Sequence, residues 1–210
     1  MRQLKLDPEL RNYYTQGVTF SDDLAGDIAA DRAQYAEQKK LENIDVELSG
    51  SDGISYIKRL IPGPQGAADV LVGIHRPVGI SSPLPALLWL HGGGMVFGHI
   101  DMDVDYIQKI ARKVGCLIVS VEYRLAPEDP FPAGLEDSYA VLKWLSAQAH
   151  ELDVKPSRIA VGGLSGGGGL AAALALLARD RQETDVMFQF LNCPMIDDGG
   201  MTPVNYKFTG

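Results

Sequence analysis

The sequence contains only two cysteines, Cys116 and Cys193, among its 210 residues. Both lie in apolar segments, so we expect two small buried hydrophobic residues and no disulfide framework. Long apolar runs are also lacking, because no stretch approaches the ~20 residues that span a bilayer. The first residues, Met1 to Pro8, have no apolar run of signal-peptide length. We therefore predict a cytoplasmic protein that does not bind membranes.

Basic side chains are scarce as well. Lys and Arg number 19 against 27 Asp and Glu, which gives a net charge of −8. Such a surface repels phosphate backbones, so we expect no nucleic-acid partner. A hydrophobic content of 46% with 22% charged residues is typical of a globular protein. The length allows one α/β domain or two small ones.

Two kinds of pattern divide the chain. Residues 1–42 are rich in Ala and charged residues with apolar side chains near helical spacing, which predicts a helical segment. From residue 43 onward strands appear, at 44–48, 54–61 and 68–76, separated by Gly- and Pro-rich turns. Their spacing and alternation predict an antiparallel meander.

Strands and helices then alternate up to the end of the chain. Apolar strands are expected at 86–90, 116–123, 158–162 and 186–193, and helices at 104–114, 134–149 and 166–179. Continuous apolar strands that alternate with helices indicate a mostly parallel sheet covered on both faces. The sequence therefore predicts an α/β core over residues 43–210.

Four unusual segments follow the ends of these strands. In open parallel sheets, ligands bind outside the carboxyl ends of the strands, so these segments are expected to share one edge. Their shared position favours a functional role for each of them. They are His91-Gly92-Gly93-Gly94, Arg124-Leu125-Ala126-Pro127-Glu128, Gly163-Leu164-Ser165-Gly166-Gly167 and Pro194-Met195-Ile196-Asp197-Asp198.

The segment around Ser165 fits G-x-S-x-G between a strand and a helix. A nucleophile elbow needs glycine two residues either side of the serine, and it places the serine at a helix N-terminus. The alternatives are a glycine turn needed only for packing, and a dinucleotide site. Gly166, Gly168 and Ala171 satisfy G-x-G-x-x-A, with Asp197 as the ribose-binding acid.

The segment at 91–94 favours the elbow over its alternatives. Three consecutive glycines after a buried strand let backbone N–H groups turn towards a ligand. An oxyanion hole requires this of the loop that supplies its N–H donors. A flexible glycine turn with a chance histidine does not explain a second matching motif at the same sheet edge.

With these motifs in place, the sequence resembles the hormone-sensitive-lipase-like family of α/β-hydrolase serine esterases. Residues 121–133, Val-Glu-Tyr-Arg-Leu-Ala-Pro-Glu-Asp-Pro-Phe-Pro-Ala, are close to that family's Tyr-Arg-Leu-Ala-Pro-Glu segment, and the resemblance covers about residues 60–200. It implies that residues 1–42 form an N-terminal helical cap segment, and that Arg124 and Glu128 are scaffold for the active-site edge.

The resemblance also implies a serine acyl-enzyme mechanism on short- to medium-chain esters, with no metal or cofactor. Ser165 would attack the ester carbonyl, and backbone N–H groups of Gly93, Gly94 and Gly166 would hold the oxyanion. His91 and Gly92 would support the oxyanion loop. Acyl and alcohol preference would depend partly on residues beside that loop, Met95, Val96 and Phe97.

The sequence departs from the family in two ways. Leu164 and Gly166 flank the serine where the family usually has an acid and an alanine. In addition, all four histidines precede Ser165, whereas the fold orders its triad Ser, Asp or Glu, then His. We therefore expect a chain truncated after the sixth strand of the family fold, without the triad acid and base. His99 is the only local substitute for the base.

Two other functions stay open beside an esterase. A non-catalytic small-molecule binder is the first, because plant gibberellin receptors resemble this family and lack the base. A dinucleotide enzyme is the second, although this interpretation does not explain the glycine motif at 91–94. The last strand would form an exposed apolar edge, which invites a homo-oligomer or completion of the sheet by another polypeptide.

Overall fold

The protein is described by a computed structural model. It describes residues 53–80 and 83–197 throughout, the backbone of 47–49 and, before them, Gly26, Ala30, Arg32 and Ala33. The predicted cap segment at 1–42 therefore lies almost wholly outside the described residues, as does Asp198. The chain divides into two compact units, 1–38 and 39–210, and all the strands described below belong to the second.

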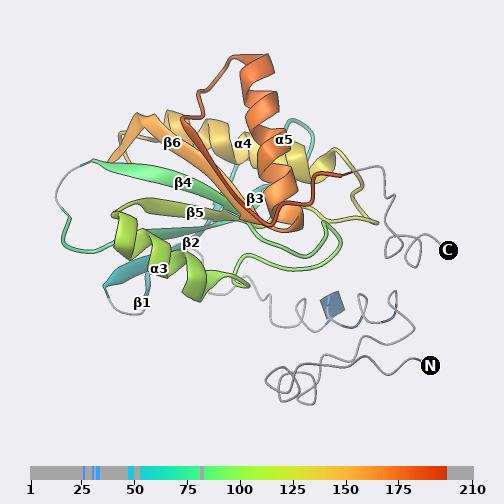
Figure 1. Cartoon of the computed structure of the whole chain (residues 1–210), viewed down its shortest axis with the longest axis horizontal. Coiled ribbons are helices and arrows are strands. Elements are labelled where there is room, and N and C mark those ends of the chain that lie inside the picture. Colours follow the sequence, from blue (N-terminus) through green and yellow to red (C-terminus); the bar gives the residue numbers. More distant parts are fainter. Residues whose placement is uncertain are drawn as a thin grey trace. The chain divides into compact units, whose positions relative to one another are not determined.

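A seven-stranded mixed sheet forms the centre of this unit, in the order β1-β2-β3-β5-β4-β6-β7 (Figure 1). Strands β4 (Leu84–Leu90), β5 (Leu117–Val121), β6 (Val154–Leu164) and β7 (Phe188–Asn192) are mutually parallel. The carboxyl ends of these four strands therefore meet at one edge of the sheet.

The other three strands form the antiparallel part. Strand β1 (Glu47–Ser49) pairs with β2 (Ile54–Ile61), and β2 pairs with β3 (Val70–Pro77). Strand β3 then pairs antiparallel with β5, so β2 runs in the same direction as β4 to β7. Five of the seven strands share one direction, and the predicted meander followed by a mostly parallel sheet is confirmed.

Helices cover the sheet on both faces, as predicted (Figure 1). Helix α3 (Val104–Val114) lies on one face, and α4 (Ala133–Ala147) and α5 (Gly166–Arg181) lie on the other. Strand β4 shows why its sequence is apolar without alternation. Leu88 and Leu90 point into the core beneath α4 and α5, whereas Leu87 and Trp89 point into the core beneath α3. Both faces of the strand are buried.

Some details differ from expectation. Strand β6 begins at Val154, four residues before the predicted start. The sequence predicts the later start because Pro156 is a residue type that usually interrupts a strand. The pairing with β4 is irregular between Leu84 and Ala86, which accommodates this segment. Cys116 is buried as predicted, but the prediction for Cys193 is wrong. Cys193 is exposed because it directly follows the edge strand β7.

Strand β7 pairs only with β6 and forms one edge of the described sheet. Its side chains are more exposed than those of the central strands, and Phe188 is 59% exposed. No helix within the described residues is long and apolar enough to cross a membrane.

Candidate active site

The four segments singled out in the sequence follow β4, β5, β6 and β7, at the shared carboxyl edge. Backbone hydrogen bonds join them directly. The Ala126 N–H donates to the Met95 carbonyl at 3.0 Å, and the Met195 N–H donates to the Ser165 carbonyl at 3.0 Å. These bonds join the segments in two pairs, and the close approach of Gly166 to the Gly94 backbone links the pairs.

Ser165 lies at the turn between β6 and α5 with φ 54° and ψ −117°. A non-glycine residue with positive φ is strained, and such strain concentrates at functional sites. The flanking glycines explain why the turn can close. A Cβ on Gly163 would lie 2.7 Å from the Leu90 carbonyl oxygen, and one on Gly167 would overlap the same atom. Neither position has room for a side chain.

Gly168 and Gly169, the next residues of α5, face other parts of the edge. A Cβ on Gly168 would lie 3.1 Å from the Pro194 Cα, and one on Gly169 would overlap the Met195 carbonyl. Protein backbone thus fills the space that a bound pyrophosphate would need. Close packing against this backbone explains why the run consists of glycines, and it counts against the dinucleotide alternative.

Backbone contacts hold Ser165 on both sides. Its N–H donates to the Asn192 carbonyl at 2.9 Å, and its carbonyl accepts from Gly169 N–H at 3.1 Å and from Met195 N–H. The Ser165 side chain caps no helix N–H. Its hydroxyl makes no hydrogen bond to any other described residue, so the Oγ is available to a ligand at the sheet edge.

The oxyanion loop, residues 91–95, approaches the elbow closely. A Cβ on Gly166 would lie 2.9 Å from the backbone N of Gly94 and 3.1 Å from that of Met95. Gly94 and Met95 both have left-handed backbones, with φ of 61° and 64°. The structure therefore brings Gly94 and Gly166 together, as predicted, and adds the Met95 N–H. Gly93 has φ 115° and turns the chain against Phe97.

His91 is buried at 2% exposure, directly before the glycines. Its Nδ1 donates to the Gly92 carbonyl at 2.7 Å, and its ring stacks on Tyr123 with centroids 4.2 Å apart. Burial lowers the pKa of His91, so the ring is neutral at pH 7. A neutral, stacked ring supports the predicted role for His91 in fixing the loop.

Sequence reasoning missed two residues of this edge. The Tyr123 hydroxyl donates to the His91 carbonyl at 2.7 Å, and burial raises the pKa of Tyr123 so that the donor proton is retained. Asp137 on α4 is 1% exposed and accepts hydrogen bonds from Arg124. The signal for Asp137 was available, since an acid on the inner face of an amphipathic helix needs a partner.

Most of the chain matches known proteins. Residues 87–208 match the family described as alpha/beta hydrolase fold. The chain belongs to the α/β-hydrolase fold family. Its predicted resemblance to the hormone-sensitive-lipase-like esterases is confirmed by its named relatives.

Three relatives of this α/β hydrolase illustrate the likeness. Carboxylesterase NlhH of Mycobacterium tuberculosis is 36% identical over 190 residues, which are 90% of this chain and 57% of NlhH. The structure of a bacterial heroin esterase matches with TM-score 0.81 and 39% identity, over 96% of this chain and 62% of the other. The hyperthermophilic esterase of Pyrobaculum calidifontis matches with TM-score 0.74 and 32% identity, again over 96% and 62%. The chain thus spans less than two thirds of each relative.

A small cavity of about 170 Å³ borders the oxyanion loop of this chain. It is mostly apolar, with Arg124 and Asp129 as its charged members. The remaining lining residues come from the oxyanion loop and the residue after it, from the segment after β5, and from the beginnings of α4 and α5: Gly94, Met95, Val96, Tyr123, Ala126, Phe131, Pro132, Gly134, Leu135 and Leu170.

Proposed function

We propose that this chain carries the nucleophile and the oxyanion hole of a serine carboxylesterase. The observation that carries the proposal is the approach of the Gly94 and Met95 backbone nitrogens to Gly166, beside the strained Ser165. Neither N–H donates a backbone hydrogen bond within the described part of the chain. Unpaired N–H groups beside a serine suit a developing oxyanion.

In the proposed reaction, the Ser165 Oγ bonds to the ester carbonyl carbon while its proton leaves to a base. The carbonyl oxygen becomes an oxyanion, held by N–H groups of the loop and of Gly166, with Gly93, Gly94 and Gly166 as the predicted set. Collapse of this intermediate breaks the carbon–oxygen bond to the alcohol, which takes the proton and departs. Water then attacks the acyl-enzyme and releases the carboxylic acid.

The apolar cavity next to Gly94 supports short- to medium-chain acyl esters as substrates. Its volume of about 170 Å³ resembles that of cavities that hold a benzene-sized group, roughly 150 Å³. Met95 and Val96 line it, which agrees with the prediction that residues beside the oxyanion loop set the preference.

The base of this proposed esterase is not among the described contacts of Ser165. The His91 ring donates to the Gly92 carbonyl and stacks on Tyr123. His99, the candidate to substitute for the base, accepts a hydrogen bond from the Asp101 N–H at its Nδ1, at 3.3 Å. This favours one second candidate, the non-catalytic binder of the same fold. A serine without a base is a weak nucleophile, although an oxyanion hole alone gives roughly 10³–10⁴ over water.

Hydrolysis of p-nitrophenyl butyrate by the purified chain tests the proposal, beside Ser165→Ala and the matched control Ser157→Ala, an exposed serine. We expect turnover that Ser165→Ala abolishes and Ser157→Ala leaves unchanged. Labelling of Ser165 by a fluorophosphonate, located by mass spectrometry, is the second expected result. If the chain neither hydrolyses the ester nor is labelled, but binds the intact ester tightly, the esterase proposal is wrong and the non-catalytic binder takes its place.

Cytoplasmic location, a homo-oligomer and completion of the sheet by another polypeptide stay predictions. The first apolar residues that a partner strand would meet are on β7, where Phe188 is 59% exposed. Sedimentation of the purified chain as a stable monomer would contradict both kinds of assembly.

A further inference from the structure

Both ends of the oxyanion loop are hydrogen-bonded to the short segment that follows β5. The Tyr123 hydroxyl donates to the carbonyl of His91, where the loop begins, at 2.7 Å. The Ala126 N–H donates to the carbonyl of Met95, where the loop ends, at 3.0 Å. The path of the chain from residue 123 to 126 therefore sets the distance between the two anchors of the loop.

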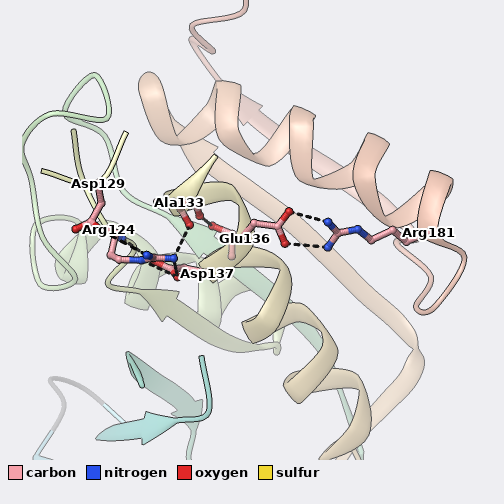
Figure 2. Close-up of polar contacts among 8 residues, drawn as sticks. Arg124, Asp129, Ala133, Glu136, Asp137 and Arg181 are labelled. Carbon is pink, nitrogen blue, oxygen red and sulfur yellow. Dashed lines mark hydrogen bonds and ion pairs between the residues drawn. The ribbon is translucent and has the colours of Figure 1, made fainter. Parts of the chain in front are cut away.

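That path is held by one buried carboxylate. Asp137 Oδ2 accepts from the Arg124 backbone N–H at 2.9 Å and from Arg124 Nε at 2.9 Å, while Oδ1 accepts from the second guanidinium nitrogen at 2.8 Å (Figure 2). Asp137 thus binds the backbone and the side chain of the same residue, midway between the two loop anchors. A bidentate charged pair of this kind is strong and directional.

The anchored loop holds a conformation that needs support. Met95 is left-handed at φ 64° although it is not glycine, and its carbonyl is the one that Ala126 binds. If residues 124–126 shifted, Met95 would lose this bond and relax towards a negative φ. The N–H groups of Gly94 and Met95 would then turn away from Gly166.

We propose that Asp137 is a positioning residue for the oxyanion hole, acting through both the backbone and the guanidinium of Arg124, and through Ala126 and Met95. The inference rests on the proposed esterase function for its catalytic meaning. The geometric part, that Asp137 fixes the conformation of the oxyanion loop, stands on the contacts of the structure alone.

The neighbouring residue provides a matched control. Glu136, on the same turn of α4, also forms a bidentate pair, with Arg181 at 2.6 and 2.9 Å (Figure 2). Figure 2 shows the two carboxylates reaching to opposite sides, Asp137 towards Arg124 and Glu136 towards the end of α5. Glu136→Gln therefore weakens a similar pair on the same helix without touching the loop.

The first test compares amide chemical shifts of the ¹⁵N-glycine-labelled chain in wild type, Asp137→Asn and Glu136→Gln. We expect the Gly93 and Gly94 signals to move in Asp137→Asn and to stay in place in Glu136→Gln. Equal shifts in the two variants, or none in either, would overturn the proposal. This readout needs no turnover, so it stands even where the esterase function fails.

The second test measures kcat and KM for p-nitrophenyl butyrate, or the rate of Ser165 labelling. We expect Asp137→Asn to lower kcat or the labelling rate at least about tenfold with little change in KM, because misplaced donors weaken the transition state most. A rise in KM alone, or equal losses in Glu136→Gln, would contradict a positioning role. Wild type without turnover or labelling would instead count against the proposed function.

Where Asp137→Asn does not fold, Arg124→Gln replaces it. This variant keeps the backbone N–H bond to Asp137 and removes the guanidinium of a side chain that is 34% exposed. We expect the same glycine signals to move, by less. Unchanged signals in a folded Arg124→Gln variant would reject the proposal.

Discussion

His75 on β3 should make the fold sensitive to acid. The ring is fully buried and stacks on Tyr56 with centroids 4.3 Å apart. Its Nε2 donates to Ser120 Oγ and its Nδ1 accepts from the Gln108 amide, each at 3.3 Å. Burial lowers the pKa of His75 from 6.5 to about 4, which Asp101 partly opposes.

The sign and size of the effect follow from this difference. The unfolded chain takes up a proton as the pH falls through 6.5, whereas folded His75 takes it up only near 4. His75 therefore contributes no penalty above pH 6.5, and stability is lost as the pH falls from 6.5 to about 4. The full loss is about 3 kcal/mol, at about 1.4 kcal/mol per pKa unit. That is a large part of a typical stability of about 5–15 kcal/mol.

Urea unfolding followed by circular dichroism over this pH range measures the effect in wild type, His75→Gln and His150→Gln. We expect His75→Gln to lose about 3 kcal/mol less on acidification, with the exposed His150 variant behaving as wild type. Some loss remains in every variant because the pKa of buried His91 is also lowered. If His75→Gln loses as much stability as wild type, the reasoning about its burial is refuted.

Two further substitutions probe the elbow. Gly167→Ala would force a methyl group into the Leu90 and His91 carbonyls, which pushes the elbow and the oxyanion loop apart, so we expect turnover or Ser165 labelling to fall about 10²-fold, as when one oxyanion donor is lost. Gly168→Ala, whose methyl group would lie 3.1 Å from its nearest neighbours, the Gly163 carbonyl oxygen and the Pro194 Cα, should keep most of the rate, and equal losses would contradict the argument. Ser165→Gly should raise the free energy of unfolding by about 1 kcal/mol, because glycine relieves the strain at φ 54°. Urea unfolding beside Ser165→Ala checks this, and an equal gain in the alanine variant would show that strain is not the cause.

Much of the fold could be predicted because its signals are local. Helix α3 begins and ends where its apolar periodicity predicts, and β2 does the same between its Gly- and Pro-rich turns. The apolar strands β4 and β5 predict burial on both faces, and each strand is followed by one of the four segments that meet at the active edge.

The contacts that hold the site could not be predicted in this way. Asp137 reaches Arg124 across a turn and a bend of the chain, which no periodicity encodes. Met95 adopts a left-handed backbone although methionine is no turn signal, because Ala126 and the neighbouring glycines impose it. The exposure of Cys193 depended on which strand lies at the sheet edge, which the sequence of β7 alone does not tell.

The central place of β4 has a kinetic consequence. The oxyanion loop leaves the end of β4, and Ser165 leaves the end of β6, its parallel neighbour. Both strands that pair with β4, β5 and β6, are synthesised after it. The segments that form the site are also far apart in the sequence, 74 positions from His91 to Ser165. Pairings between such distant segments form slowly, because a long loop must close first. We therefore expect the two halves of the candidate site to meet late in folding, after the β1–β3 meander has formed from local contacts.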